Sequence, residues 1–581
     1  MSPTGATRLL DRLPSAAPGP VARGLWALAL VAVGAGIAAW ATWTLQGGVI
    51  ALWCFSVAAV ALALALPLPL ALASPLFMGV FGWLVDMLPF VILAGWATVI
   101  VRWGWRLWSE RRSPRGGRWI WLPIGLVVWT ALGVTQIDLS LDLKHFVLLL
   151  GIQVLSSGTL LMVVDQVDDL RGRSAMVAAL VAFIVVMSVA VFAEWIGAPI
   201  QEMQNSDIRK RVEEVYGVDA FPNNLGMIKY ARSSRGGAKE FRAELERFAE
   251  KNPDLPRFDV FLPKFQAFDT TNIVVRFDAS ARPFERELAT VGRGVELRYD
   301  NIGLTPANSV PRMRSLSRNS LTYAGSCVAL FFLSFYLFWT GAGRRKVLGL
   351  IGVVACLFGA GFSLARGAWV AIPFGIVYLL VDRLLPARHR VVVVGAFVAG
   401  AVVLSGVYLL KYGVDPISAR AGGEASFGTR QSVYEDTIES VNGIHFLVGY
   451  GTETPRTASG VSHELGRYIP KAGTHSTYLN YLFRTGVPGA LGIILVYALS
   501  VLHARAAAWS RAGDERVLDA LLAAAVVAAA AHAVILSLYV EPIYTLIISA
   551  LLGLAVAGGK DLGAPLLFWK RPTRDLSVTS P

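Results

Sequence analysis

The chain is poor in charged residues and in cysteine, and both shortages restrict what it can be. Only 16% of its 581 residues are charged, whereas soluble domains carry about 25%. This excludes a string of ordinary soluble domains. The three cysteines, Cys54, Cys327 and Cys356, all fall within apolar stretches and lack metal-ligand spacing. They predict neither a disulfide framework nor a metal site, and we interpret them as small buried hydrophobic residues.

Long apolar stretches dominate instead. Hydrophobic residues make up 55% of the chain and the mean hydropathy is +0.55. Since a helix needs about 20 mostly apolar residues to cross a bilayer, the sequence predicts roughly 14 spans. The first block is too long for a signal-peptide core and is expected to stay as a helix. The expected spans lie near 24–45, 48–65, 67–85, 88–104, 118–135, 145–164, 174–195, 320–341, 347–364, 367–384, 390–410, 487–505, 516–538 and 541–558.

The basic residues predict how these helices are oriented. The formal net charge is +13, and the Lys and Arg residues concentrate in short connections such as "RWGWRLWSERRSPRGGR" (102–118) and "GRRK" (343–346). With the predicted helices, these connections fall on one side, which the positive-inside rule assigns to the cytoplasm. The charges form no nucleic-acid-binding stripe, so no nucleic-acid partner is expected.

Two long polar segments then face outward and divide the chain into five parts. The segment 196–318 contains a helix-like run, "AKEFRAELERFAEK", and strand-like runs, "FDVFL", "TNIVVRF" and "VELRY". It predicts a small extracytoplasmic α/β insert domain. The predicted fold is therefore an all-α polytopic membrane protein with an α/β insert. Its expected parts are helices in 1–195, the insert at 196–318, helices in 319–411, an extracytoplasmic catalytic loop at 412–486, and helices with a cytoplasmic tail in 487–581.

Three residues on the predicted outer face are able to carry chemistry. Arg366 lies in a short connection between two helices, Arg430 begins a helix-like run, and His475 precedes the return into the membrane. Each also has a structural interpretation. Arg366 can anchor a helix at the lipid headgroups, Arg430 can pair with an acidic neighbour such as Glu435, and His475 can simply precede Ser476 as a helix N-cap.

The order of the motifs around these residues adds a resemblance. Arg366-Gly-Ala-Trp is followed by "TRQ", "YEDTI", "LVGYGTET" and "THSTYLNYLFRTGVPG". Over roughly 345–560 this pattern resembles the O-antigen ligase and O-antigen polymerase superfamily of bacterial inner-membrane glycosyltransferases. Two departures affect the expected acceptor more than the reaction: Ser476 stands where the family often has Asn, and the insert at 196–318 is additional.

The resemblance implies a GT-C-like, metal-independent, inverting enzyme without a cofactor. Its donor would be a glycan on undecaprenyl diphosphate, its acceptor a glycan or glycolipid, and its site the periplasmic face of the inner membrane. Arg366 and Arg430 would meet the charge that grows on the leaving diphosphate. Outside the resembling region, Arg314 and Arg318 lie on the predicted outer face against the usual charge bias, and we expect them to extend this site. His475 would act as general base toward the acceptor hydroxyl.

The nearest acidic cluster does not suggest a metal site. Asp165, Asp168 and Asp169 share one face of a helix but lie on the predicted cytoplasmic side. We interpret them as a solvated helix end.

Two alternatives remain open. A polymerase of the same superfamily would use a second lipid-linked glycan as acceptor. A secondary transporter would place ionisable groups at membrane depth, and His532 is the clearest such residue, with Asp86, Glu194 and Glu541 near helix ends. The transporter predicts that the outer-loop residues are dispensable, whereas the ligase predicts that they are essential.

Overall fold

The computed structural model describes ten long stretches of the chain and some shorter ones. The long stretches are 47–77, 88–115, 117–137, 143–167, 169–196, 320–363, 365–412, 441–451, 476–535 and 541–559, and the shorter ones lie within 225–300, 434–439 and 461–468. The chain divides into two compact units, Met1–Ser113 and Pro114–Pro581, and each is taken by itself.

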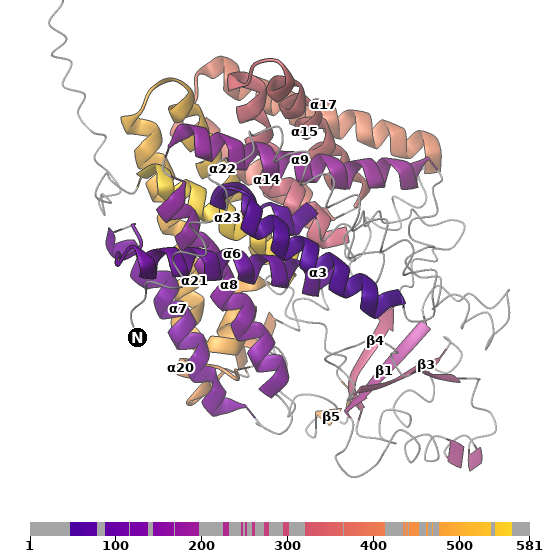
Figure 1. Ribbon diagram of the computed structural model, residues 1–581. Helices are drawn as coiled ribbons and strands as arrows, with labels where there is room; N and C mark the ends of the chain where they lie inside the picture. Colours follow the sequence, from indigo (N-terminus) through magenta and orange to yellow (C-terminus); the bar gives the residue numbers. More distant parts are fainter. Residues whose placement is uncertain are drawn as a thin grey trace, which may run out of the picture. The chain divides into compact units, whose positions relative to one another are not determined.

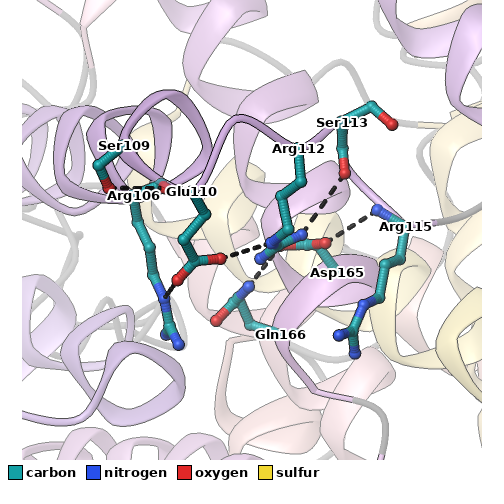
Figure 2. A network of polar contacts seen from close by, with 8 residues as sticks. All are labelled: Arg106, Ser109, Glu110, Arg112, Ser113, Arg115, Asp165 and Gln166. Atoms are coloured by element: carbon teal, nitrogen blue, oxygen red, sulfur yellow. Dashed lines mark hydrogen bonds and ion pairs between the residues drawn. The ribbon is translucent and has the colours of Figure 1, made fainter.

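In the first unit, α3 (Gly47–Ala65) packs against α6 (Leu88–Ser109). Arg102 of α6 donates from Nη1 to the carbonyl oxygens of Ala63 (2.9 Å) and Leu66 (2.7 Å). These carbonyls lie at the C-terminal end of α3, where a helix offers them no N–H partner. After α6, Glu110 accepts from Arg106 and Arg112, as Figure 2 shows. These two hydrogen bonds lower the pKa of the Glu110 carboxyl.

The span predicted over 67–85 is wrong in its described part. A four-residue helix, α4 (Leu68–Ala71), is followed by a turn at 72–73. Pro67, Pro69 and Pro75 supply no backbone N–H, so this apolar stretch cannot form one uninterrupted helix. The predicted span 24–45 lies outside the described residues.

The helices of the second unit are shown in Figure 1. They are η2 (Gly117–Ile120), α7 (Trp121–Leu132), η3 (Gly133–Gln136), α8 (Leu143–Gln166), α9 (Leu170–Trp195), α14 (Ser320–Thr340), α15 (Arg344–Phe362), α16 (Arg366–Asp382), α17 (Ala387–Tyr412), α20 (His445–Val448), α21 (Thr477–Ser510), α22 (Gly513–Ile535) and α23 (Pro542–Gly559).

Within the described residues, eight helices are long and apolar enough to cross a membrane. They are α8, α9, α14, α15, α17, α21, α22 and α23. The chain is therefore a multi-pass membrane protein, and its membrane part is helical. The predicted total of roughly 14 spans exceeds these eight, in part because α7 and α16 have only 12 and 17 residues.

Helix α14 is the centre of the second unit. It packs against α9, α15, α16, α22 and α23, and it is buried from Thr322 to Leu337. Gly359 of α15 lies directly against Tyr323 and Cys327 of α14. A side chain there would separate the two helices, so the glycine permits this close approach. Cys327 and Cys356 are buried and free, as interpreted from the sequence.

A four-stranded antiparallel sheet lies in the predicted insert. Its strands are β1 (Leu225–Ala231), β2 (Phe258–Phe261), β3 (Asn272–Phe277) and β4 (Gly294–Asp300), in the order β2-β3-β1-β4. The last three fall on the runs that the sequence predicts as strands. The helix-like run is described only at a few residues, so the α/β class of the insert stays a prediction. A two-stranded sheet, β5 (Val461–Ser462) and β6 (Arg467–Tyr468), lies further along.

Candidate active site

Of the five predicted site residues, the structure describes Arg366. Arg314, Arg318, Arg430 and His475 lie outside the described residues. Arg366 is the exposed first residue of α16. The connection before it is short: Ser363 ends α15, and its hydroxyl accepts from the backbone N–H of Ala365 at 3.4 Å. Arg366 therefore stands at a tight turn between two helices, as the sequence predicts.

The register of α16 against α22 fixes the height of Arg366 in the bundle. Arg516, near the start of α22, donates to the carbonyl of Leu384 just beyond the end of α16 at 3.0 Å. Gly375 of α16 lies against the carbonyl of Ala524. The two helices are thus antiparallel. Continuing the register by about nine residues at 1.5 Å each brings Arg366 level with His532, near the end of α22.

The start of α21 reaches the same end of α22. Tyr478 donates from its hydroxyl to the carbonyl of Ala530 at 3.1 Å. Ser476, the residue directly after His475, is buried and caps α21 by accepting from the N–H of Leu479. Arg366 and Ser476 therefore both flank the last turns of α22. We call Arg366, Ser476, Tyr478 and His532 the candidate site.

Helix α21 is broken at Gly486, and the chain folds back there. Gly486 has φ 67° and ψ −172°. In a straight helix the stretch from 478 to 497 would span about 28 Å, yet the rings of Tyr478 and Tyr497 are 6.2 Å apart. The segment 477–485 thus returns beside the segment that begins at 487. Pro488 is tolerated because it lies in the first turn of that second segment.

Three backbone carbonyl groups at the break accept hydrogen bonds from outside α21. Phe483 accepts from the N–H of Tyr450 at 2.8 Å, and Arg484 accepts from the N–H of Gly451 at 2.9 Å. Thr485 accepts from the indole Nε1 of Trp129 on α7, also at 2.9 Å. These three hydrogen bonds hold the last residues before the break against the turn after α20 and against α7.

The turn after α20 can reach the break because it contains glycine. Gly449 has φ 70° and ψ −163°, and Gly486 has a similar conformation, a region that only glycine enters readily. A Cβ on Gly449 would collide with the backbone of Arg484 and Thr485, and one on Gly486 would collide with the carbonyl of Leu447. The two backbones are therefore in direct contact.

Stacked rings cover this contact. Tyr450 lies between His445, at 3.8 Å between ring centroids, and Phe483, at 4.6 Å. The ring nitrogen Nδ1 of His445 is 2.9 Å from the carbonyl oxygen of Gly449. Burial raises the pKa of the Tyr450 phenol. The "GYG" motif thus acts as a clasp on α21, and we call residues 445–451 the clasp.

A buried polar stripe on the segment 477–485 was missed in the sequence. Thr477, Asn480, Tyr481 and Arg484 are all buried, at the spacing of one helix face. Tyr481 donates to Oε1 of Gln153 on α8 at 2.6 Å, and Gln153 donates to the hydroxyl of Ser157 at 3.2 Å. Four polar residues at helical spacing, directly after the candidate base, were the signal that could have found it.

His532 is fully buried against α23 and α14. Its Nδ1 lies 3.5 Å from the hydroxyl of Tyr544, and Gly325 packs against its ring. The residue that the transporter interpretation singles out therefore packs tightly inside the bundle, at the level of Arg366.

The acidic residues of the predicted cytoplasmic side separate into different roles. Asp169 is exposed and caps α9 by accepting from the N–H of Gly172 at 2.9 Å. Asp165 is buried and accepts from the N–H of Arg115 at 2.8 Å (Figure 2), so the expected solvated helix end is wrong for this residue. Asp168 lies outside the described residues. No group of three potential metal ligands occurs in the part of the chain that the structure describes.

A buried ion pair stands at the opposite end of α22. Arg173 of α9 pairs with Asp519, and both side chains have 0% exposure. Arg511, after the end of α21, contacts the other Asp519 oxygen at 3.5 Å. The carboxylate thus joins α9, α21 and α22 far from the candidate site.

Comparison with known families agrees with the motifs. Residues 351–494 match the family model described as O-Antigen ligase, which confirms the resemblance for this part of the chain. The match begins in α15, includes Arg366 and the clasp, and ends within α21. No curated protein sequence matches the chain significantly.

Proposed function

Since residues 351–494 carry an O-antigen ligase domain, we propose that the chain is a membrane glycosyltransferase of bacterial cell-surface polysaccharide synthesis. It transfers a glycan from undecaprenyl diphosphate to an acceptor hydroxyl. One arrangement supports the proposal: the register of α16 against α22, continued to Arg366, leads to the same end of α22 that Tyr478 contacts, three residues after His475. A cation and a base are the two groups that this reaction needs.

Arg366 and Arg430 bind the diphosphate of the donor, and Arg314 and Arg318 extend this site. As the bond from the anomeric carbon to the diphosphate oxygen breaks, negative charge grows on that oxygen. Guanidinium groups meet such charge with paired, charge-assisted hydrogen bonds. Because they are held in place before the reaction, little reorganisation is needed.

His475 takes the proton of the acceptor hydroxyl while the hydroxyl oxygen attacks the anomeric carbon. An imidazole is suited to this role near neutral pH. Attack from the side opposite the leaving diphosphate inverts the anomeric centre, and the arginines supply the positive charge in place of a metal ion. The reaction takes place on the periplasmic face of the inner membrane.

The test is glycan transfer by the purified full-length protein from an undecaprenyl-diphosphate oligosaccharide to a glycan or glycolipid acceptor, with and without EDTA. His475→Ala is expected to lower the rate about 10²–10⁴-fold, the usual contribution of a general base. Arg366→Ala is expected to lower it strongly, and Arg366→Lys to restore it only in part, because lysine cannot form the paired hydrogen bonds.

Arg344→Ala is the matched control, because Arg344 is the exposed first residue of α15, as Arg366 is of α16. It should transfer at the wild-type rate. A single addition to the acceptor identifies a ligase, and a ladder of products identifies a polymerase. Equal rates for wild type, His475→Ala and Arg366→Ala would remove both residues from the mechanism, and a folded wild type that transfers to no acceptor would end the proposal.

A further inference from the structure

The break in α21 is hydrogen-bonded to a helix outside the matched domain. Phe483 and Arg484 receive their donors from the clasp, which lies within residues 351–494. The third carbonyl, that of Thr485, receives its donor from Trp129 of α7, 356 positions earlier in the chain. The ligase domain alone therefore supplies two of the three donors.

We propose that Trp129 is a positioning residue for the transfer reaction. Its indole N–H fixes the last carbonyl before the break, and with it the direction in which the segment 477–485 leaves Gly486. That segment is helical, and its N-cap, Ser476, is next to His475. A change in angle at the break thus moves the end that carries the candidate base. The inference rests on the proposed function of His475.

Residues on both sides of Trp129 pack closely against the clasp and α21. Gly133, one turn further along and the first residue of η3, lies against Gly451 of the clasp. Leu126, nearly one turn earlier, packs on Gly492 in the second segment of α21. Together, α7 and η3 thus contact the clasp, the break and the second segment. The indole hydrogen bond joins this surface to the first segment.

The expected loss of kcat follows from the need to hold the base His475 close to the acceptor hydroxyl. A reacting group displaced by about 1 Å can lose roughly a hundredfold in rate, and loss of one hydrogen bond permits a smaller movement. We expect Trp129→Phe to lower kcat about tenfold, while the KM for the lipid-linked donor changes little. Because the environment of His475 changes, the midpoint of the pH profile of kcat should move.

Benzothienylalanine at position 129 sharpens the test, since it keeps the shape of indole and lacks only the N–H. It should reproduce Trp129→Phe. Trp119→Phe is the matched control, because Trp119 is buried and its Nε1 has no hydrogen-bond partner among the described residues. This variant makes the same indole-to-phenyl change and should keep the wild-type kcat per folded molecule and the same pH midpoint.

A loss of folded protein would lower the amplitude of the pH profile without moving its midpoint, and would overturn the inference. So would a benzothienylalanine variant that behaves as wild type. Amide hydrogen exchange of Tyr450 and Gly451 gives a readout that needs no substrate. Faster exchange in Trp129→Phe than in Trp119→Phe supports the role of Trp129 in the break, and equal exchange refutes it. If the wild type itself transfers no glycan, the proposed function fails while this measurement still reports on Trp129.

Discussion

The ring of Tyr478 lies 6.2 Å from the ring of Tyr497, although a straight helix would hold these residues far apart. This contact shows that α21 consists of two segments lying side by side, with the break at Gly486 between them. The residue after His475 is thereby brought into the bundle, next to the end of α22. The geometry of this fold-back determines what the candidate site can do.

Gly449→Ala should open the break. The substitution forces alanine into a glycine-only conformation, at a cost of about 1–3 kcal/mol, and pushes its Cβ against Arg484. We expect a lower thermal unfolding temperature in detergent and loss of glycan transfer. Gly443→Ala is the control, since Gly443 also has a positive φ, 54°, but nothing lies near its missing side chain. If both variants unfold at the same temperature, the contact between clasp and helix contributes nothing.

Asp519→Asn should destabilise the bundle strongly. It leaves Arg173 charged and buried without its counter-ion, which typically costs about 3–5 kcal/mol. The double substitution Arg173→Met with Asp519→Leu removes both charges and is expected to regain most of the loss. Thermal unfolding compares these variants with Asp514→Asn, an exposed carboxylate in the first turn of the same helix. A double variant no more stable than Asp519→Asn would show that the pair is not the cause.

How far the sequence predicts the structure depends on hydropathy. Spans such as α14, α22 and α23 begin and end within a few residues of their predicted limits, because their boundaries coincide with a change from apolar to polar residues. The second segment of α21 begins where predicted, at 487, since Gly486 and Pro488 mark it. The segment 477–485 was not predicted as a helix, because its polar stripe makes it look like a loop.

Arg366 at a helix start was expected, whereas the partners of the break were not. The hydrogen bond from Trp129 to Thr485 joins residues whose spacing carries no local signal. Likewise, the acidic run containing Asp165 looks solvated in the sequence, and only the chain segment folded onto it, at Arg115, explains its burial.

Tyr450 predicts a loss of stability in alkaline solution. Its pKa is raised in the folded protein by burial, so the neutral phenol is favoured there. As the pH rises through about 10, the ordinary tyrosine value, the unfolded chain ionises first and folding becomes less favourable. Below that pH the contribution stays constant. We expect the unfolding temperature of the wild type to fall more than that of Tyr450→Phe between pH 8 and 11; parallel curves would contradict this.

The hydrogen bond between Tyr481 and Gln153 should couple α21 to α8. Tyr481→Phe removes the hydroxyl and leaves the Gln153 amide oxygen without that donor, which typically costs about 1–3 kcal/mol. Gln153→Leu and the double variant complete a double-mutant cycle by thermal unfolding. We expect a coupling energy of about 1 kcal/mol. Additive effects would mean that the two side chains act independently, despite their 2.6 Å separation.

The hydrogen bond that Trp129 of α7 donates has a consequence for chimeric proteins. A chimera that receives only residues 351–494 of this chain inherits the clasp and the carbonyls of Phe483, Arg484 and Thr485, but not the indole of Trp129. Its third carbonyl then depends on whatever side chain the host offers at that position. Grafts bounded by the matched domain should therefore fail more often than grafts that carry α7 along, and a tryptophan introduced into the host helix at the equivalent place should restore them.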